Sequence, residues 1–177
     1  PLSDQQLRHK LGWTREQALA AIRRCVPMAR DLGLDVIVGG EDASRADHDF
    51  FLLSAEIAQD VGARRFRFAD TLGILEPFGT QALFQRLRAA VDLELEMHAH
   101  DDLGLATANT LAAALGGATH VNTTVNGLGE RAGNAALEDV VMGLRKLYGF
   151  RVEVDLSRFP ALSQRVADAA NRPLSWH

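Results

Sequence analysis

The sequence predicts an α/β fold built on a parallel sheet, and two observations support this. Short apolar runs alternate with amphipathic segments of helical length, which is the pattern of right-handed βαβ units. A polar cluster follows each apolar run, at the point where a strand would end. In a (β/α)8 barrel all strand ends converge on one mouth, whereas in an open sheet only those beside the switch point meet. We therefore expect a TIM (β/α)8 barrel.

The number of units indicates half of such a barrel. A complete barrel has eight strands and about 250 residues, with about 200 as a lower limit. The chain has 177 residues and about four β/α units. We expect residues 1–150 to form the second half of the barrel and residues 151–177 to form a segment that leaves it.

Each element has a local reason in the sequence. Thr14 is a good N-cap for the first long helix and Gly33 a good terminator. Pro77 suits the first turn of a later helix, and Gly116 follows an Ala-rich one. The expected strands lie near residues 34–39, 63–70, 93–100 and 119–125. The expected helices cover residues 14–32, 47–61, 77–91, 106–115 and 134–148.

Composition excludes several classes of protein. Hydrophobic residues make up 47% and charged residues 24%, as in globular proteins, and the net charge of −4 favours neither nucleic acid nor an anionic membrane. No apolar run is long enough to span a bilayer. The single cysteine, Cys25, is expected to be a small core residue, and a chain without an internal disulfide is expected in the cytoplasm.

The third expected strand ends in two histidines. Side chains alternate between the faces of a strand, so Glu94, Glu96, His98 and His100 share one face. Two imidazoles in this arrangement can chelate a divalent metal from one side. The alternative from spacing alone is a pair of polar surface histidines on an edge strand.

A glycine-rich loop follows the fourth expected strand, at residues 122–134 (Asn-Thr-Thr-Val-Asn-Gly-Leu-Gly-Glu-Arg-Ala-Gly-Asn). Its glycines allow the backbone to turn tightly and to approach a ligand, although an ordinary connecting loop has the same composition. At a common mouth with the histidines, Glu130 and Asn134 of this loop could face a metal.

Together with His-Ala-His-Asp-Asp-Leu-Gly at residues 98–104, this loop resembles the two signatures of the homocitrate and 2-isopropylmalate synthase family, which are metal-dependent TIM-barrel enzymes. Residues 39–47 and 68–74 are similar to two further strand ends of that family. The sequences of these motifs are most similar to those of homocitrate synthases of nitrogen-fixing bacteria, and the resemblance covers about residues 1–175.

The resemblance implies condensation of acetyl-CoA with 2-oxoglutarate to give homocitrate and CoA. It implies a divalent cation (Mg, Mn, Zn or Co) held by His98, His100 and Asn134. It further implies that Thr71, with Asp70 beside it, binds the oxo acid. The same likeness makes Glu41 a catalytic carboxylate, and Glu130 a second one near the thioester. The resemblance also implies a homodimer, and we expect no nucleic-acid or membrane partner.

The chain also departs from the family pattern. It has no Asp-x-x-x-Arg-Asp-Gly motif, from which the family takes a further metal ligand and an arginine. His177 is expected to be a frayed terminal residue rather than the family's downstream catalytic histidine. Asp101 stands where the family pattern has asparagine.

Three alternative functions follow from these features. A 2-isopropylmalate or citramalate synthase would use another oxo acid, 2-oxoisovalerate or pyruvate. A half-barrel that binds metal or a partner without turnover would fit the missing motif. A zinc hydrolase of the amidohydrolase kind also carries His-x-His on a barrel strand, but there on the first strand.

Overall fold

The computed structural model describes residues 1–174 and contains a four-stranded parallel sheet in chain order. Its strands are β1 Ile37–Gly40, β2 Arg65–Asp70, β3 Glu94–Ala99 and β4 His120–Asn122. The prediction of four parallel strands is confirmed. Strand β4 is shorter than expected, because residues Val125–Gly127 turn into a short 3-10 helix (η3).

Helices connect and flank the strands. They are α1 Asp4–Gln6, α2 Arg15–Asp31, α3 His48–Asp60, α4 Pro77–Ala90, α5 Ala106–Leu115, α6 Leu137–Lys146 and α7 Phe159–Ala170. A short π-helix, η1 Leu7–Leu11, follows α1, and short 3-10 helices lie at η2 Ala43–Arg45 and η4 Leu156–Arg158. The Thr14 side chain accepts from the backbone N–H of Gln17, and the Gln17 side chain in turn accepts from the Thr14 N–H, so the predicted cap is a capping box. Helix α6 begins three residues later than predicted.

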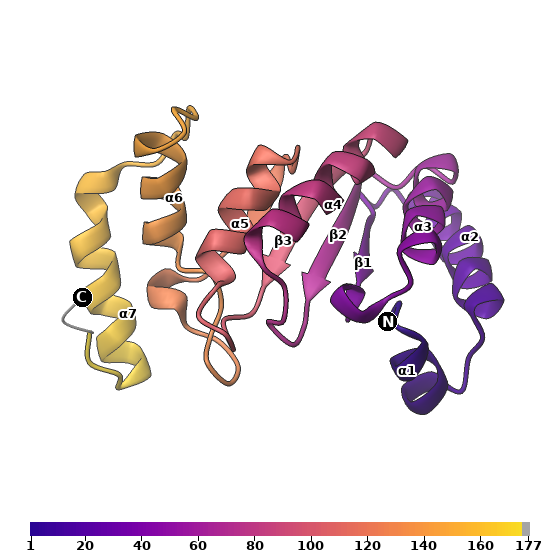
Figure 1. The fold of residues 1–177 in the computed structure, drawn as a ribbon, viewed down its shortest axis with the longest axis horizontal. Coiled ribbons are helices and arrows are strands. Elements are labelled where there is room, and N and C mark those ends of the chain that lie inside the picture. The colour runs from indigo at the N-terminus through magenta and orange to yellow at the C-terminus, as the bar shows by residue number, and fades with distance from the viewer. Residues whose placement is uncertain (175–177) are drawn as a thin grey trace.

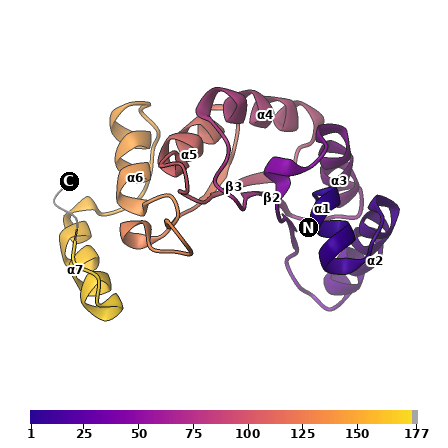
Figure 2. The same ribbon diagram turned by 60° about the horizontal axis from the view of Figure 1, so that its bottom comes forward.

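The helices and strands form an open crescent, with helices α3 to α6 along its convex side (Figures 1 and 2). The core lies between the sheet and these helices. Phe51 of α3 packs edge-on against Phe66 and Phe68 of β2, with ring centroids 5.3 and 5.1 Å apart. Phe84 of α4 lies 5.9 Å from Phe68 in the same way. These contacts fix the convex face of β2.

The concave face of the sheet carries charged residues. Glu96 of β3 accepts from Arg65 at 2.8 Å and from Arg67 at 2.6 Å. Arg65 also contacts Glu94 at 2.9 Å. The charged residues that β2 and β3 present on this face are therefore paired with one another.

The C-terminal part of the described chain packs back onto the loop that follows β4. Asn126 donates a hydrogen bond to the backbone oxygen of Ser163 on α7, and the Ser163 hydroxyl donates to Glu138 of α6. Cys25 is exposed on α2, so its expected core position is wrong. His177 lies outside the described residues. Among residues 1–174, no helix combines the length and apolar character needed to cross a membrane.

Candidate metal and substrate site

The two histidines lie together where β3 ends. Their ring centroids are 5.0 Å apart and their ring planes are almost perpendicular, at 86°. The backbone N–H of His100 donates to the Asp70 carbonyl at the end of β2. His100 is buried, whereas His98 is partly accessible on the concave face. The strand geometry therefore brings both imidazoles to the predicted end of the sheet.

His98 is also held from the side by the neighbouring strand. Its Nδ1 lies 3.0 Å from Oδ1 of Asn122 on β4, which is the residue paired with it in the sheet register. Burial lowers the pKa of His98 and outweighs the hydrogen bond to Asn122, which acts in the opposite direction. The ring is thus favoured in its neutral form, which is the form that donates a lone pair to a metal.

The glycine-rich loop places Asn134 beside His100. The two residues form an isolated antiparallel bridge, and the N–H of Ala135 donates to the Ala99 carbonyl at 3.2 Å. These bonds keep residues 134–136 extended, which is why α6 begins at Leu137. A Cβ on Gly133 would lie 2.1 Å from the carbonyl oxygen of Gly127, so this close turn requires glycine.

Two buried polar atoms at this point lack hydrogen-bond partners in the described part of the chain. They are Nδ1 of His100 and Oδ1 of Asn134. An imidazole nitrogen and an amide oxygen are both donors that divalent metals accept, and burying either without a partner is costly. The residues present therefore fit a divalent cation. Within residues 1–174, however, no group of three or more His, Cys, Asp and Glu side chains is close enough to hold one.

Asp70 and Thr71 end β2. The Asp70 carboxylate is fully buried and accepts from the backbone N–H groups of Ile74 and Leu75, at 3.1 and 3.0 Å. It therefore orders the loop that follows. The Thr71 hydroxyl oxygen accepts from the N–H of Asp42 at 2.8 Å, which leaves its own hydrogen free to donate.

Glu41 and Asp42 follow β1 and differ in environment. The Glu41 side chain is exposed by 41% and pairs with Lys10, whose Nζ lies 2.8 and 3.1 Å from its two oxygens. Asp42 is fully buried and accepts from Arg45 and from the Ser3 hydroxyl. Sequence reasoning did not identify Lys10, since it lies 31 residues from its partner.

The acidic residue of the glycine-rich loop faces solvent. The Glu130 side chain is 79% exposed and contacts Arg131 at 3.7 Å. Arg131 itself joins three loops, because it pairs with Asp102 at 2.7 Å and donates to the Thr71 carbonyl at 2.7 Å. Asp101 accepts from the N–H of Ala106 at 2.8 Å, so it serves the start of α5.

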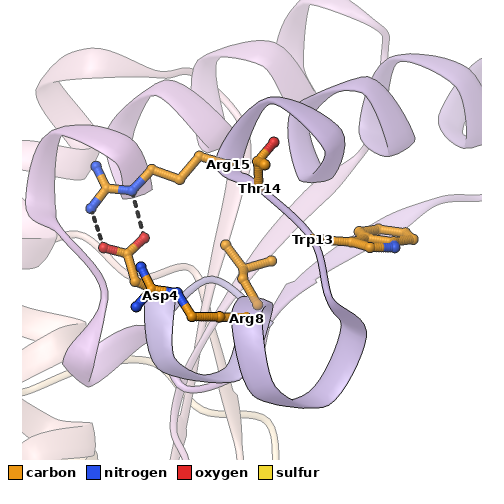
Figure 3. A pocket seen from close by; sticks show the side chains of 6 residues that line it. Asp4, Arg8, Trp13, Thr14 and Arg15 are labelled. Atoms are coloured by element: carbon orange, nitrogen blue, oxygen red, sulfur yellow. Dashed lines mark hydrogen bonds and ion pairs between the residues drawn. The ribbon is translucent and has the colours of Figure 1, made fainter.

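The structure also has a hollow of about 320 Å³ elsewhere, beside α1 and the start of α2 (Figure 3). Asp4 and Arg15 face each other across it through two hydrogen bonds of 2.6 Å. None of the residues that line it belongs to the predicted site.

The chain is similar to known proteins in sequence and in fold. The family model described as HMGL-like matches residues 1–166. The chain is 49% identical to 2-isopropylmalate synthase 2 of Caldanaerobacter subterraneus, over 97% of this chain and 45% of that protein. It is equally 49% identical to homocitrate synthase 1 of Nostoc sp., over 96% and 45%, and to homocitrate synthase of Frankia alni, over 98% and 50%. The chain thus spans about half the length of these curated relatives.

Solved structures share the fold. The HMG-CoA lyase of Bacillus subtilis superposes with a TM-score of 0.82 at 21% identity, over 98% of this chain and 62% of that one. The carboxyl transferase domain of Rhizobium etli pyruvate carboxylase gives a TM-score of 0.72, over 85% and 26%. The predicted partial TIM barrel is confirmed. The chain belongs to the HMGL-like family.

Proposed function

We propose that the protein containing this chain condenses acetyl-CoA with a 2-oxo acid, and that this acid is 2-oxoglutarate. The new carbon–carbon bond joins the acetyl methyl carbon to the ketone carbon, and water then cleaves the thioester to release CoA and homocitrate. Support comes from the relatives, which are named as homocitrate and 2-isopropylmalate synthases. The observation that carries the proposal is the histidine pair with Asn134 beside it, because its buried donors lack partners.

His98, His100 and Asn134 are the residues of this chain that would hold the divalent cation. Such a cation polarises a ketone and stabilises the alkoxide that develops from it. The free hydroxyl hydrogen of Thr71 would donate to the carboxylate of the oxo acid. Asp70 would act by ordering the loop behind Thr71, since its two oxygens are taken by backbone N–H groups.

Two carboxylates would serve the acetyl-CoA side. Glu41 would accept the proton from the acetyl methyl group, after its ion pair with Lys10 opens toward the substrate. Glu130 is exposed on the loop and free to approach the thioester. We propose that a homodimer is the active form, in keeping with the family resemblance.

Two specific observations support other functions. A relative named as a 2-isopropylmalate synthase is as similar as the homocitrate synthases, so a different oxo acid is the second candidate. Residues 1–174 supply no group of three or more His, Cys, Asp and Glu side chains for a metal, which favours a half-barrel without turnover when the 177 residues stand alone.

A thiol-release assay separates these functions. The protein is expressed from its complete gene, the 177-residue chain is prepared in parallel, and each receives acetyl-CoA with 2-oxoglutarate, 2-oxoisovalerate or pyruvate. We expect CoA release with 2-oxoglutarate from the complete protein. Release of CoA only with another oxo acid would change the substrate assignment. No release from either protein preparation with any of the three oxo acids would contradict the synthase function.

A variant of Thr71 tests the oxo-acid contact. Thr71→Val should raise the KM for the oxo acid and leave that for acetyl-CoA nearly unchanged, because a hydrogen bond to a charged group is worth about 1.5–3 kcal/mol. The control is Thr119→Val, which removes a hydroxyl just before β4, where it contacts the backbone of Leu95. Equal changes in both KM values for Thr71→Val would show a general loss of structure instead.

A further inference from the structure

We infer that Asn122 is a positioning residue that fixes the tautomer of His98, so that Nδ1 carries the hydrogen and Nε2 presents the lone pair. The inference rests on the proposed function in one respect only, namely that the lone pair on Nε2 binds the cation. The contacts that support it lie entirely within the concave face of β2, β3 and β4.

The first step is the charge state of Glu96. Glu96 is only 3% exposed. Its two carboxylate oxygens lie 2.8 Å from a guanidinium nitrogen of Arg65 and 2.6 Å from one of Arg67. A carboxylate between two guanidinium groups stays ionised, and an ionised carboxylate can only accept hydrogen bonds. Any amide group that faces Glu96 must therefore present its N–H end.

The second step orients the amide of Asn122. Its Nδ2 donates to Oε1 of Glu96 at 3.5 Å, and its Oδ1 lies 3.0 Å from Nδ1 of His98. Exchanging the amide oxygen and nitrogen would place an oxygen against the carboxylate and lose that contact. The arginine pair thus determines, through Glu96, which end of Asn122 faces the histidine.

The third step assigns the histidine. An amide oxygen has no hydrogen to give, so Nδ1 of His98 must be the donor in the contact with Asn122. In a neutral imidazole the other nitrogen, Nε2, then holds the lone pair. A hydrogen bond from one ring nitrogen to a protein oxygen is the usual means of orienting a metal-binding histidine.

His100 shows that the arrangement is specific to one histidine. Its Nδ1 is buried with no partner among the described residues, so no comparable contact fixes its tautomer. The two histidines therefore differ, and only His98 is oriented before a ligand arrives. The sheet register causes the difference, because His98 pairs with Asn122 and β4 ends at that residue.

The test measures the tautomer directly. The protein is expressed from its complete gene with ¹⁵N-labelled histidine, and long-range ¹H–¹⁵N spectra are recorded without metal. His98→Gln identifies the signals of His98. We expect the hydrogen of His98 on Nδ1 in the parent and in Asn122→Asp, which keeps an acceptor oxygen. Asn122→Leu should lose this preference.

The second readout is the affinity for Zn²⁺, measured in competition with a chelator. Asn122→Leu should bind Zn²⁺ about 10- to 100-fold more weakly than the parent, as expected when such a contact is removed. The matched control is His120→Gln, which changes a residue of β4 whose contacts are with Thr119 and Glu94. It should leave both readouts unchanged.

Two results would overturn the inference. One is a His98 lone pair on Nδ1 in the parent protein, and the other is an unchanged tautomer in folded Asn122→Leu. A parent that binds no Zn²⁺ but keeps the hydrogen on Nδ1 would instead contradict the proposed metal-dependent function and leave the role of Asn122 supported.

Discussion

The centre of the concave face and the β1 edge of the crescent differ in whether their side chains find partners within this chain. At the centre, Glu96 is buried yet fully paired with arginines of the neighbouring strand. At the edge, Ile37 of β1 is 44% exposed, and Trp13, which lines a cavity together with Val38 of the same strand, is 39% exposed. The centre is therefore complete within this chain, whereas the edge leaves apolar surface in water.

The difference indicates where the chain depends on further protein. The charged residues of a barrel interior can remain paired in half of a barrel when their partners lie on neighbouring strands of that half. A strand edge cannot, because its backbone groups and flanking side chains are meant to meet another strand. An apolar notch lined by Leu11, Trp13, Ile22 and Val38 lies at this edge.

The largest effect is expected from Glu96→Gln at the centre. It leaves Arg65, whose side chain is only 15% exposed, without its buried partner, and breaking a buried pair costs about 3–5 kcal/mol. Urea unfolding would measure the loss. Glu94→Gln is the matched control, since Glu94 is more accessible and should cost much less. Equal losses would show that burial does not distinguish the two glutamates.

The same variant should change the pH dependence of stability. Burial alone would raise the pKa of Glu96, but hydrogen bonds and charges from Arg65 and Arg67 lower it below its ordinary value of 4.5. A carboxyl with a lowered pKa in the folded state stabilises the protein above that value, and this contribution is lost as the pH falls through the folded pKa. Glu96→Gln should therefore flatten the decline below pH 4.5. If the decline of stability below pH 4.5 is unchanged in the variant, other carboxylates cause that decline.

The second largest effect is expected from Asp70→Ala, at the end of β2. The change removes both acceptors of the Ile74 and Leu75 N–H groups, and hydrogen bonds to a charged group contribute about 1.5–3 kcal/mol. Hydrogen exchange at these two amides should become faster together with the loss of stability. Asp70→Asn keeps one acceptor oxygen, so its stability and its amide exchange rates should lie between those of the parent and of Asp70→Ala. Unchanged exchange in Asp70→Ala would mean that the loop is ordered by other contacts.

A smaller effect is expected at the edge. We expect the 177-residue chain to self-associate at low micromolar concentration through β1, and Ile37→Lys should weaken this about tenfold, or about 1.4 kcal/mol. Sedimentation equilibrium is the measurement. Leu53→Lys, on α3 at 42% exposure, is the control for a general loss of apolar surface. A chain that stays monomeric would contradict the expected association, and equal effects would place it elsewhere than β1.

The smallest effect is expected from Glu153→Gln. Its oxygen lies 2.6 Å from Arg151, the same distance as in the pair of Arg67 and Glu96, but the two side chains are 89% and 76% exposed. Exposed ion pairs are screened by water and contribute little. Unfolding curves of this variant and the parent should coincide. A loss comparable with that of Glu96→Gln would mean that distance, rather than burial, decides the strength of these pairs.

The sequence by itself determined the class of fold and the face of the histidines. Alternation with a period of two placed Glu94, Glu96 and His98 on one side of β3, and the βαβ pattern made the strands parallel. Both follow from the local geometry of the backbone, which needs no knowledge of distant residues.

Only the tertiary structure decided which residues meet across strands. The contact between His98 and Asn122 depends on the register of β3 and β4, which the alternation of side chains does not specify. The start of α6 shows the same limit, because residues 134–136 are Ala-rich and favour a helix. The Ala99 carbonyl and the carbonyl of Thr124 instead bind the N–H groups of Ala135 and Leu137 and hold the segment extended beside His100. Tertiary hydrogen bonds outweigh local propensity there, and they place Asn134 in the site.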